Sequence, residues 1–96
     1  MQPYVGNAIP QSILRQIVTE TINFDFPLVP ITDDIYALEL YHGPTLAFKD
    51  VGARFMSRCL GYFNREQTQK VTVLVATSGD TGGAVANGFE GVEGVE

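Results

Sequence analysis

The chain has 96 residues, which is enough for one small domain and too few for two. Apolar residues make up 45% of it and charged residues 18%, a balance that indicates a packed core and argues against a disordered chain. Six Lys and Arg against eleven Asp and Glu give a formal charge of −5 with no basic patch, so we expect no DNA or RNA partner.

Cysteine and histidine usage indicates the compartment. The single cysteine, Cys59, cannot form an intramolecular disulfide, and one histidine, His42, leaves no cluster for a metal, so we expect no metal site. The first residues lack the basic and apolar regions of a signal peptide, and no apolar run reaches the roughly 20 residues that span a bilayer. We therefore expect a cytoplasmic protein without membrane contact.

The first third of the chain predicts one helix and an extended segment. Apolar residues recur at steps of three and four over residues 10–22, which predicts a helix with one buried face and Pro10 in its first turn. Residues 23–30 contain two prolines, which exclude a helix or a central strand and favour an extended connector. The side chains of residues 35–41 alternate between two faces, which predicts a strand, and Gly43-Pro44 ends this strand.

A second helix is predicted over residues 48–64. Its apolar positions recur at helical steps, and we expect them to be buried. They are Val51, Phe55, Met56, Cys59, Leu60 and Phe63. Because Cys59 stands among these side chains, we expect a buried, unreactive thiol.

The last third predicts a buried strand and a short helix. Residues 71–76 are a nearly continuous β-branched run, typical of a strand covered on both faces. A turn over residues 77–83 and a short helix with Ala84, Val85 and Phe89 on one side follow, and residues 91–96 lead towards another strand. A central strand needs a neighbour on each edge, and the sequence offers at most one other convincing strand. We therefore expect a piece of a longer protein.

Lys49 is the first candidate for chemistry, because it falls at the start of the helix over residues 48–64. The start of a helix carries partial positive charge, so a cation there usually has a reason, and a lysine amine can serve as a nucleophile towards a carbonyl group. On position alone the simpler interpretation is favoured, namely a solvated lysine beside Asp50 as an N-terminal helix charge. For His42, a turn histidine bonded to the backbone is likewise favoured over a site residue.

The loop over residues 77–83 is the second candidate. It follows a predicted buried strand and opens a helix, so unpaired backbone amides and the hydroxyls of Thr77, Ser78 and Thr81 can bind an anion. It matches neither GxGxxG nor GxxxxGK, which argues against a dinucleotide or a nucleoside triphosphate. A substrate carboxylate suits it better. From spacing alone, Asp80 as a plain N-cap in a glycine turn fits equally well.

Both segments resemble a known family. LYHGPTLAFKDVGARFM (residues 40–56) resembles the cofactor-lysine segment of threonine synthases, and VATSGDTGGAVA (residues 75–86) resembles their substrate-carboxylate loop. They occur in the family's order and at a suitable spacing, and the likeness runs from about residue 36 to residue 96. Cysteine synthases and dehydratases of the same fold usually carry Asn where this chain has Asp80, so the aspartate favours the threonine synthase branch.

The resemblance implies a cytoplasmic enzyme of the tryptophan-synthase-β-like fold that depends on pyridoxal 5'-phosphate (PLP). Such an enzyme converts O-phosphohomoserine and water into threonine and phosphate. Lys49 would carry PLP and move protons at Cα and Cβ of the substrate. The substrate carboxylate and the phenolic oxygen of PLP would be surrounded by Ser78, Gly79, Asp80 and Thr81, with Asp80 also counted as cofactor-binding.

The likeness also has gaps. The glycine-rich loop that binds the PLP phosphate in the family, and the partner of the pyridine nitrogen, normally lie far downstream and are not among these residues. We therefore expect the isolated chain to be inactive, and its uncovered apolar surface to allow self-association. Two alternatives remain: another PLP-dependent lyase or dehydratase of the same fold, or a small non-catalytic α/β binding module.

The predicted fold is α/β, with residues 71–76 central in a three-layer, mainly parallel open sheet that is incomplete here. Residues 1–96 are taken as one unit, with a helix and connector up to residue 34 and the strands, the Lys49 helix and the 77–83 loop after it. Simple connectivity would pair residues 35–41 with residues 71–76 through a right-handed crossover. The resemblance instead assigns residues 35–41 to the sheet of another domain, and this arrangement is the one we favour for the intact enzyme.

Overall fold

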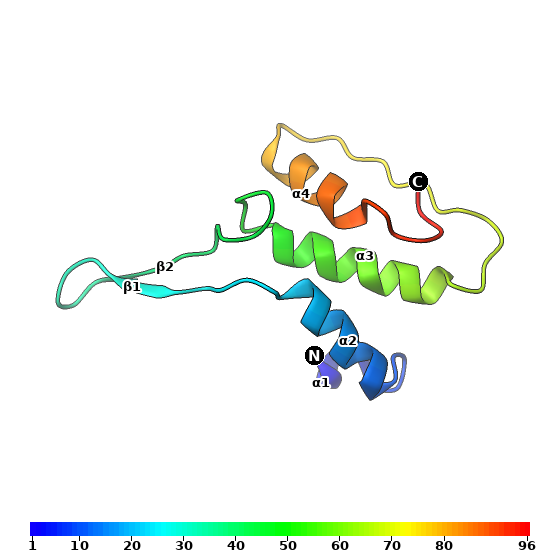
Figure 1. Cartoon of the computed structure of the whole chain (residues 1–96), viewed down its shortest axis with the longest axis horizontal. Helices are drawn as coiled ribbons and strands as arrows, with labels where there is room; N and C mark the ends of the chain where they lie inside the picture. Colours follow the sequence, from blue (N-terminus) through cyan, green and yellow to red (C-terminus); the bar gives the residue numbers. More distant parts are fainter.

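A computed structural model describes residues 1–96. It contains four helices and a two-stranded sheet, and it measures 55 × 33 × 18 Å because the strands form an arm that extends away from the helices (Figure 1). The elements in chain order are α1 (Gln2–Val5), α2 (Gln11–Thr21), β1 (Leu28–Pro30), β2 (Tyr36–Leu38), α3 (Asp50–Asn64) and α4 (Asp80–Phe89). The structure is thus a small mixed α/β unit. None of its helices is both long and apolar enough to cross a bilayer.

The helix predicted over residues 10–22 is confirmed as α2, with Pro10 as the residue just before it. Its apolar face packs against α3 and forms the one buried hydrophobic cluster, whose members are Ile9, Leu14 and Ile17. Arg54 of α3 joins the two helices a second time, because its guanidinium donates to the carbonyl oxygens of Glu20 and Thr21 at 2.6 and 3.0 Å. These bonds satisfy carbonyls at the end of α2 that have no partner within the helix.

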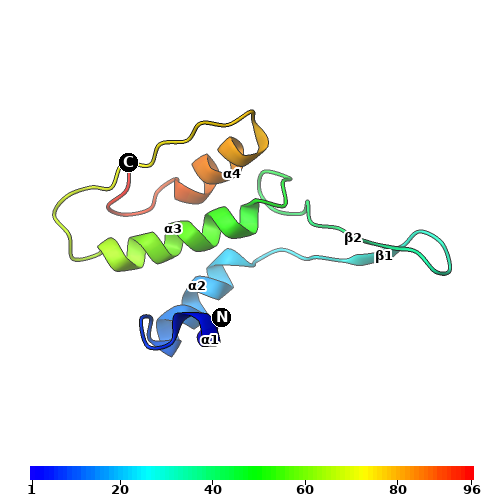
Figure 2. The same cartoon turned by 180° about the vertical axis from the view of Figure 1, so that it is seen from behind.

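The central helix α3 lies between α2 on one side and α4 on the other (Figures 1 and 2). The side towards α4 is lined by small residues: Ala53, Ser57, Ala84 and Gly88 are all buried. A Cβ on Gly88 would stand 3.0 Å from the backbone carbon of Ala53, so the two helices approach as closely as a glycine allows.

The predicted buried stripe on α3 is partly wrong. Met56 and Phe63 are 50% and 53% exposed, whereas Asp50, Ala53, Ser57 and Asn64 are buried. The helix itself begins at Asp50 rather than residue 48, with Lys49 as its N-cap. Periodicity located the helix but not its whole buried face, because α4 packs on the small residues, whereas α2 covers Phe55 and leaves Met56 and Phe63 exposed.

The arm is an antiparallel hairpin in which Leu28 pairs with Leu38 and Pro30 with Tyr36. The predicted strand over residues 35–41 is therefore present but shorter, and its partner is the segment predicted to be a connector. Pairing of residues 35–41 with residues 71–76 is wrong. Proline excludes a central strand but not an edge strand, where its missing N–H costs no ladder hydrogen bond.

Residues 71–76, predicted to be a central strand, form only the beginning of one. Val71 bridges Val95 in parallel, and the Val73 N–H donates to the carbonyl of Glu96 at 2.8 Å. No strand continues from there, and Leu74 is 90% exposed. The segment has the composition of a buried strand, but this chain supplies only three residues to pair with it.

Candidate functional site

Lys49 is the residue just before α3, as the sequence predicts. The preceding loop, residues 43–49, turns back on itself through bonds from the Leu46 N–H to the Gly43 carbonyl and from the Asp50 N–H to the Ala47 carbonyl, each 3.1 Å. The Lys49 ammonium lies 3.9 Å from the centroid of the Phe48 ring, and the side chain is 31% exposed. The amine is therefore half-buried and still reachable.

The 77–83 loop leads into α4, and Gly79 precedes the helix with a φ of 149°. The backbone N–H of Gly79 donates to no carbonyl oxygen and donates instead to the Thr77 hydroxyl at 3.3 Å. The amides of Ser78, Asp80, Thr81 and Gly82 donate to no protein group. A helix start with several free amides is a ready binding site for an anion, so the donors that the anion hypothesis requires are present.

The two candidate segments meet. Nζ of Lys49 lies 3.5 Å from Oδ2 of Asp80, across 31 positions of sequence. A hollow of about 310 Å³ lies beside them, lined by Asp80 and by residues of β2 and the 43–49 loop. Its other lining residues are Leu38, Leu40, Tyr41, Leu46, Ala47 and Phe48. An amine that can react with a carbonyl group, free anion-binding amides and an apolar hollow are thus brought together in one place.

Other sequence candidates lie outside this arrangement. His42 Nε2 donates to the Glu39 carboxylate at 2.6 Å, so its partner is a side chain rather than the predicted backbone. Hydrogen bonds from His42 and then from Tyr41 hold the pKa of Glu39 below its usual value. Cys59 is half-buried on α3, and burial raises the pKa of its thiol, in line with an unreactive cysteine.

Two polar residues near the site were not found from the sequence in any functional role. Asp50 was considered only as a helix-terminal charge, yet its carboxylate is buried and bonded to Thr45. Arg54, one turn further along α3, has its pKa lowered first by burial and then by the charge of Arg58, with the Asp50 charge acting in the opposite direction. The signal for Asp50 was its place next to Lys49, but burial of a single carboxylate depends on tertiary packing.

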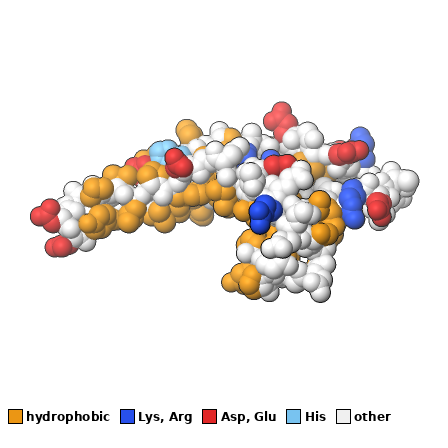
Figure 3. Space-filling view, turned by 60° about the horizontal axis from the view of Figure 1, so that its bottom comes forward, with side chains coloured by type: hydrophobic (Ala, Val, Ile, Leu, Met, Phe, Trp, Pro, Cys, Tyr) orange, Lys and Arg blue, Asp and Glu red, His pale blue; other side chains and the backbone are white.

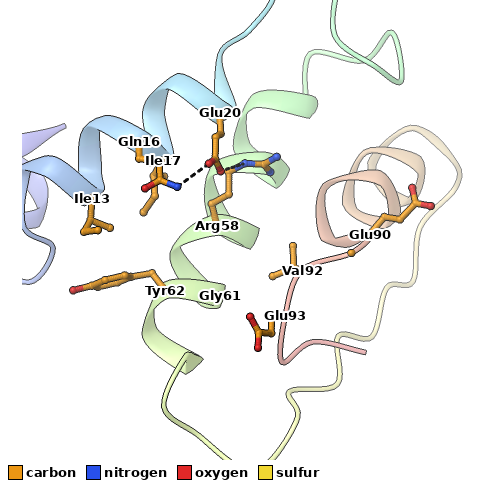
Figure 4. Close-up of a pocket in the computed structure, with 11 residues that line it drawn as sticks. Ile13, Gln16, Ile17, Glu20, Arg58, Gly61, Tyr62, Glu90, Val92 and Glu93 are labelled. Carbon is orange, nitrogen blue, oxygen red and sulfur yellow. Dashed lines mark hydrogen bonds and ion pairs between the residues drawn. The ribbon is translucent and has the colours of Figure 1, made fainter.

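A larger hollow, of about 480 Å³, lies beside the second half of α3, between that helix, α2 and residues 90–93 (Figure 4). Arg58 and Glu20 form an ion pair across it at 3.5 Å, and Gln16 donates to Glu20 at 3.0 Å. Arg58 and Glu20 are already paired with one another, and the hollow is lined by neither Lys49 nor the free amides. Size alone therefore does not mark the functional site in this chain.

Comparison with known proteins gives consistent results. No family model matches the chain. Threonine synthase of Serratia marcescens is 46% identical over 95 residues, which are 99% of this chain and 22% of that protein. The crystal structure of threonine synthase from Escherichia coli superposes with a TM-score of 0.89 at 45% identity, over 99% of this chain and 22% of that chain. The chain is homologous to one segment of threonine synthase.

A second structure extends this result. The crystal structure of PLP-bound threonine synthase from Brucella melitensis superposes with a TM-score of 0.91 at 37% identity, over 100% of this chain and 22% of that one. The chain thus spans about a fifth of the length of the threonine synthases it matches. Because the match covers the whole chain, it includes both the Lys49 segment and the 77–83 loop.

Proposed function

We propose that this chain is the cofactor-lysine segment of a threonine synthase, an enzyme that converts O-phosphohomoserine and water into threonine and phosphate with PLP. The observation that carries the proposal is the meeting of Lys49 with Asp80 and the free amides of the 77–83 loop, in a chain that is 45% identical to the E. coli enzyme. The same segment in another PLP-dependent lyase or dehydratase, or in a non-catalytic binding module, is the alternative.

The residues present fit PLP. The Lys49 amine is reachable, its partner Asp80 lines a hollow whose other lining residues are apolar, which suits a planar ring, and free amides for an anionic group lie on the facing loop. When bound, PLP supplies an electron sink that stabilises negative charge developed at the substrate's carbon atoms. Lys49 then has two tasks, to bind the cofactor's aldehyde carbon and to move protons at Cα and Cβ of the substrate.

The loop residues have binding roles in this proposal. Ser78, Gly79, Asp80 and Thr81 surround the α-carboxylate of the substrate, with amide and hydroxyl groups as donors. Asp80, which already faces the Lys49 amine, would contact both the cofactor, at its phenolic oxygen, and the substrate. A carboxylate beside a bound carboxylate would repel it, so the free amides must carry the binding and Asp80 must act mainly on the cofactor side.

The fold of the intact protein is part of the same proposal. We infer that residues 71–76 become a strand of a mainly parallel, three-layer sheet when further strands are supplied. The parallel bridge between Val71 and Val95 supports this, as does a hollow of about 550 Å³ beside it that is lined mainly by apolar residues, among them Val73, Val75 and Phe89.

A chimera tests the proposal. Residues 1–96 replace the matching segment of E. coli threonine synthase, and phosphate release and threonine formation from O-phosphohomoserine are measured. We expect activity in the chimera and a loss of at least about 10³-fold in Lys49→Ala, as for removal of a nucleophile. Lys70→Ala, at the other lysine of the chain, should leave the rate unchanged, because that side chain is 66% exposed and pairs with Glu96 beyond the C-terminal end of α3.

The same protein separates the alternatives. Release of a 2-oxo acid and ammonia from threonine or serine, without phosphate release from O-phosphohomoserine, would favour a dehydratase. A folded chimera without any of these activities would contradict the proposal and favour the binding module.

A further inference from the structure

The carboxylate of Asp50 is buried directly beside Lys49. Asp50 is the first residue of α3, and only 1% of its surface is exposed. A carboxylate removed from water must find donors within the protein, or the cost is large. Both donors come from Thr45: its backbone N–H lies 3.0 Å from Oδ2, and its hydroxyl donates to Oδ1.

The chain is closely packed around these bonds. Gly43 is buried against Asp50, and a Cβ on it would stand 2.5 Å from Oδ2 of Asp50 and 3.0 Å from the ring of Phe24. No side chain fits at this position without moving the carboxylate. Asp50 is therefore fixed both by its hydrogen bonds and by contact with the start of the 43–49 loop.

The 43–49 loop has an unfavourable backbone conformation at one residue. Leu46 has a φ of 61°, the only positive φ among the non-glycine residues, and its side chain is 71% exposed, so its own packing does not enforce that backbone. Such a conformation persists only where the surrounding structure compensates for it. Two backbone bonds within the loop supply part of the compensation, and the pair of bonds between Thr45 and Asp50, which span Leu46, supplies the side-chain part.

We propose that Asp50, through Thr45, is a positioning residue that holds the 43–49 loop in the shape from which the Lys49 amine faces Asp80. The inference rests on the proposed function, because it assigns to Asp50 the placement of the lysine that carries the cofactor. Asp50 does not touch the reacting atoms. Its two bonds fix where the main chain enters α3, and Lys49 is the last residue before that point.

The test uses the chimera with Asp50→Ala, Asp50→Asn and Thr45→Val. Asp50→Ala removes both bonds, and we expect kcat to fall about 100-fold with little change in KM, the effect of a misplaced reacting group. In Asp50→Asn the amide can still accept from the Thr45 N–H and donate to its hydroxyl, so kcat should stay within about threefold of the parent. If the two residues act together, adding Thr45→Val to Asp50→Ala should cause no further loss.

A second readout needs neither activity nor cofactor. Acetic anhydride labels the two lysines, and peptide mass spectrometry gives the ratio of Lys49 to Lys70 labelling. We expect Asp50→Ala to change this ratio at least about threefold, because the loop opens locally, and Asp50→Asn to restore it. Leu14→Ala is the matched control: it removes a buried side chain at the α2–α3 contact, so it lowers stability without touching the 43–49 loop.

The outcomes are distinct. An unchanged labelling ratio in Asp50→Ala, or an equal loss of kcat in Leu14→Ala, would show that Asp50 serves stability alone and would overturn the inference. If the parent chimera has no activity, the proposed function fails, and the labelling ratio still decides whether Asp50 places Lys49.

Discussion

Lys49 and Asp80 are 31 positions apart in sequence, and the Nζ atom of the first lies 3.5 Å from the Oδ2 atom of the second. The lysine is placed by the start of α3 and the aspartate by the start of α4, and these helices pack through small residues at Ala53 and Gly88. Because the Asp80 side chain is 75% exposed, the ion pair contributes little to stability. The ion pair matters for the geometry of the site, because it shows that the N-terminus of α3 and the N-terminus of α4 lie next to each other.

Asp80→Asn tests the role of this carboxylate. In the chimera, we expect kcat/KM for O-phosphohomoserine to fall by about tenfold or more, because a charge facing the cofactor is lost, while the melting temperature changes little for a side chain this exposed. Steady-state phosphate release and thermal unfolding measure both. Glu93→Gln removes an equal charge from an exposed position on the chain and should have no effect. Equal rates in parent and Asp80→Asn would contradict the role.

Gly88→Ala tests how closely α3 and α4 must approach. A new Cβ would stand 3.0 Å from the backbone of Ala53, and overpacking of about 1–3 kcal/mol should exceed the gain of about 1 kcal/mol from alanine in a helix. Gly83→Ala is the matched control in the same helix, where nothing lies within 4 Å and only the gain applies. Urea unfolding of the chain should therefore place Gly88→Ala below the parent and Gly83→Ala above it. The reverse order would show that the helix contact is loose.

The isolated 96-residue chain is expected to show no threonine synthase activity and to hold PLP weakly. In the family the phosphate of PLP is bound elsewhere by a glycine-rich helix start, and losing two charge-assisted bonds of about 2 kcal/mol each weakens binding on the order of a thousandfold. Borohydride trapping after incubation with PLP, followed by peptide mapping, measures this. Stoichiometric labelling confined to Lys49 at micromolar PLP, or turnover that disappears in Lys49→Ala, would prove the expectation wrong.

The isolated chain is also expected to self-associate through the hairpin arm, where hydrophobic side chains gather (Figure 3). Leu28 and Leu38 face each other across the hairpin and are 63% and 57% exposed. The double variant Leu28→Lys/Leu38→Glu keeps a favourable cross-strand pair while removing apolar surface, so light scattering should show a shift towards monomer. Tyr4→Lys, at an exposed residue on α1, is the control. A parent chain that stays monomeric over a wide concentration range would contradict this prediction.

Sequence patterns predicted α2, α3 and α4 because helical periodicity is a local property, whereas the four-residue α1 is too short to show a period and was not predicted. Residues 10–22 and 48–64 gave α2 and α3 to within two residues at each end. The strands were harder, since a strand exists only with a partner. Because proline argues against a strand, Pro30 prevented the prediction of β1. Residues 71–76 have the composition of a central strand, but only Gly94 to Glu96 pair with them. Long-range pairing is the part of the fold that composition does not encode.

The candidate site was predictable to a similar extent. Lys49 and the 77–83 loop stood out as a lysine at a helix start and a glycine-rich turn after an apolar run, but only their joint resemblance to threonine synthases made them the candidate site. The bonds between Thr45 and Asp50 could not, because whether a carboxylate is buried depends on which residues, here Gly43 and Phe24, pack over it.

The backbone conformation at Gly79 determines which enantiomer of an amino acid the turn tolerates at this position. With φ at 149° and ψ at −70°, this residue occupies a region that L-amino acids avoid, although a side chain there would meet nothing within 4 Å. The obstacle to a side chain at this point is thus stereochemical rather than steric crowding by neighbours. In a chemically synthesised chain, D-alanine at residue 79 would be less strained in this turn than L-alanine. The chirality of this one residue thus decides how well the turn into α4 tolerates a side chain.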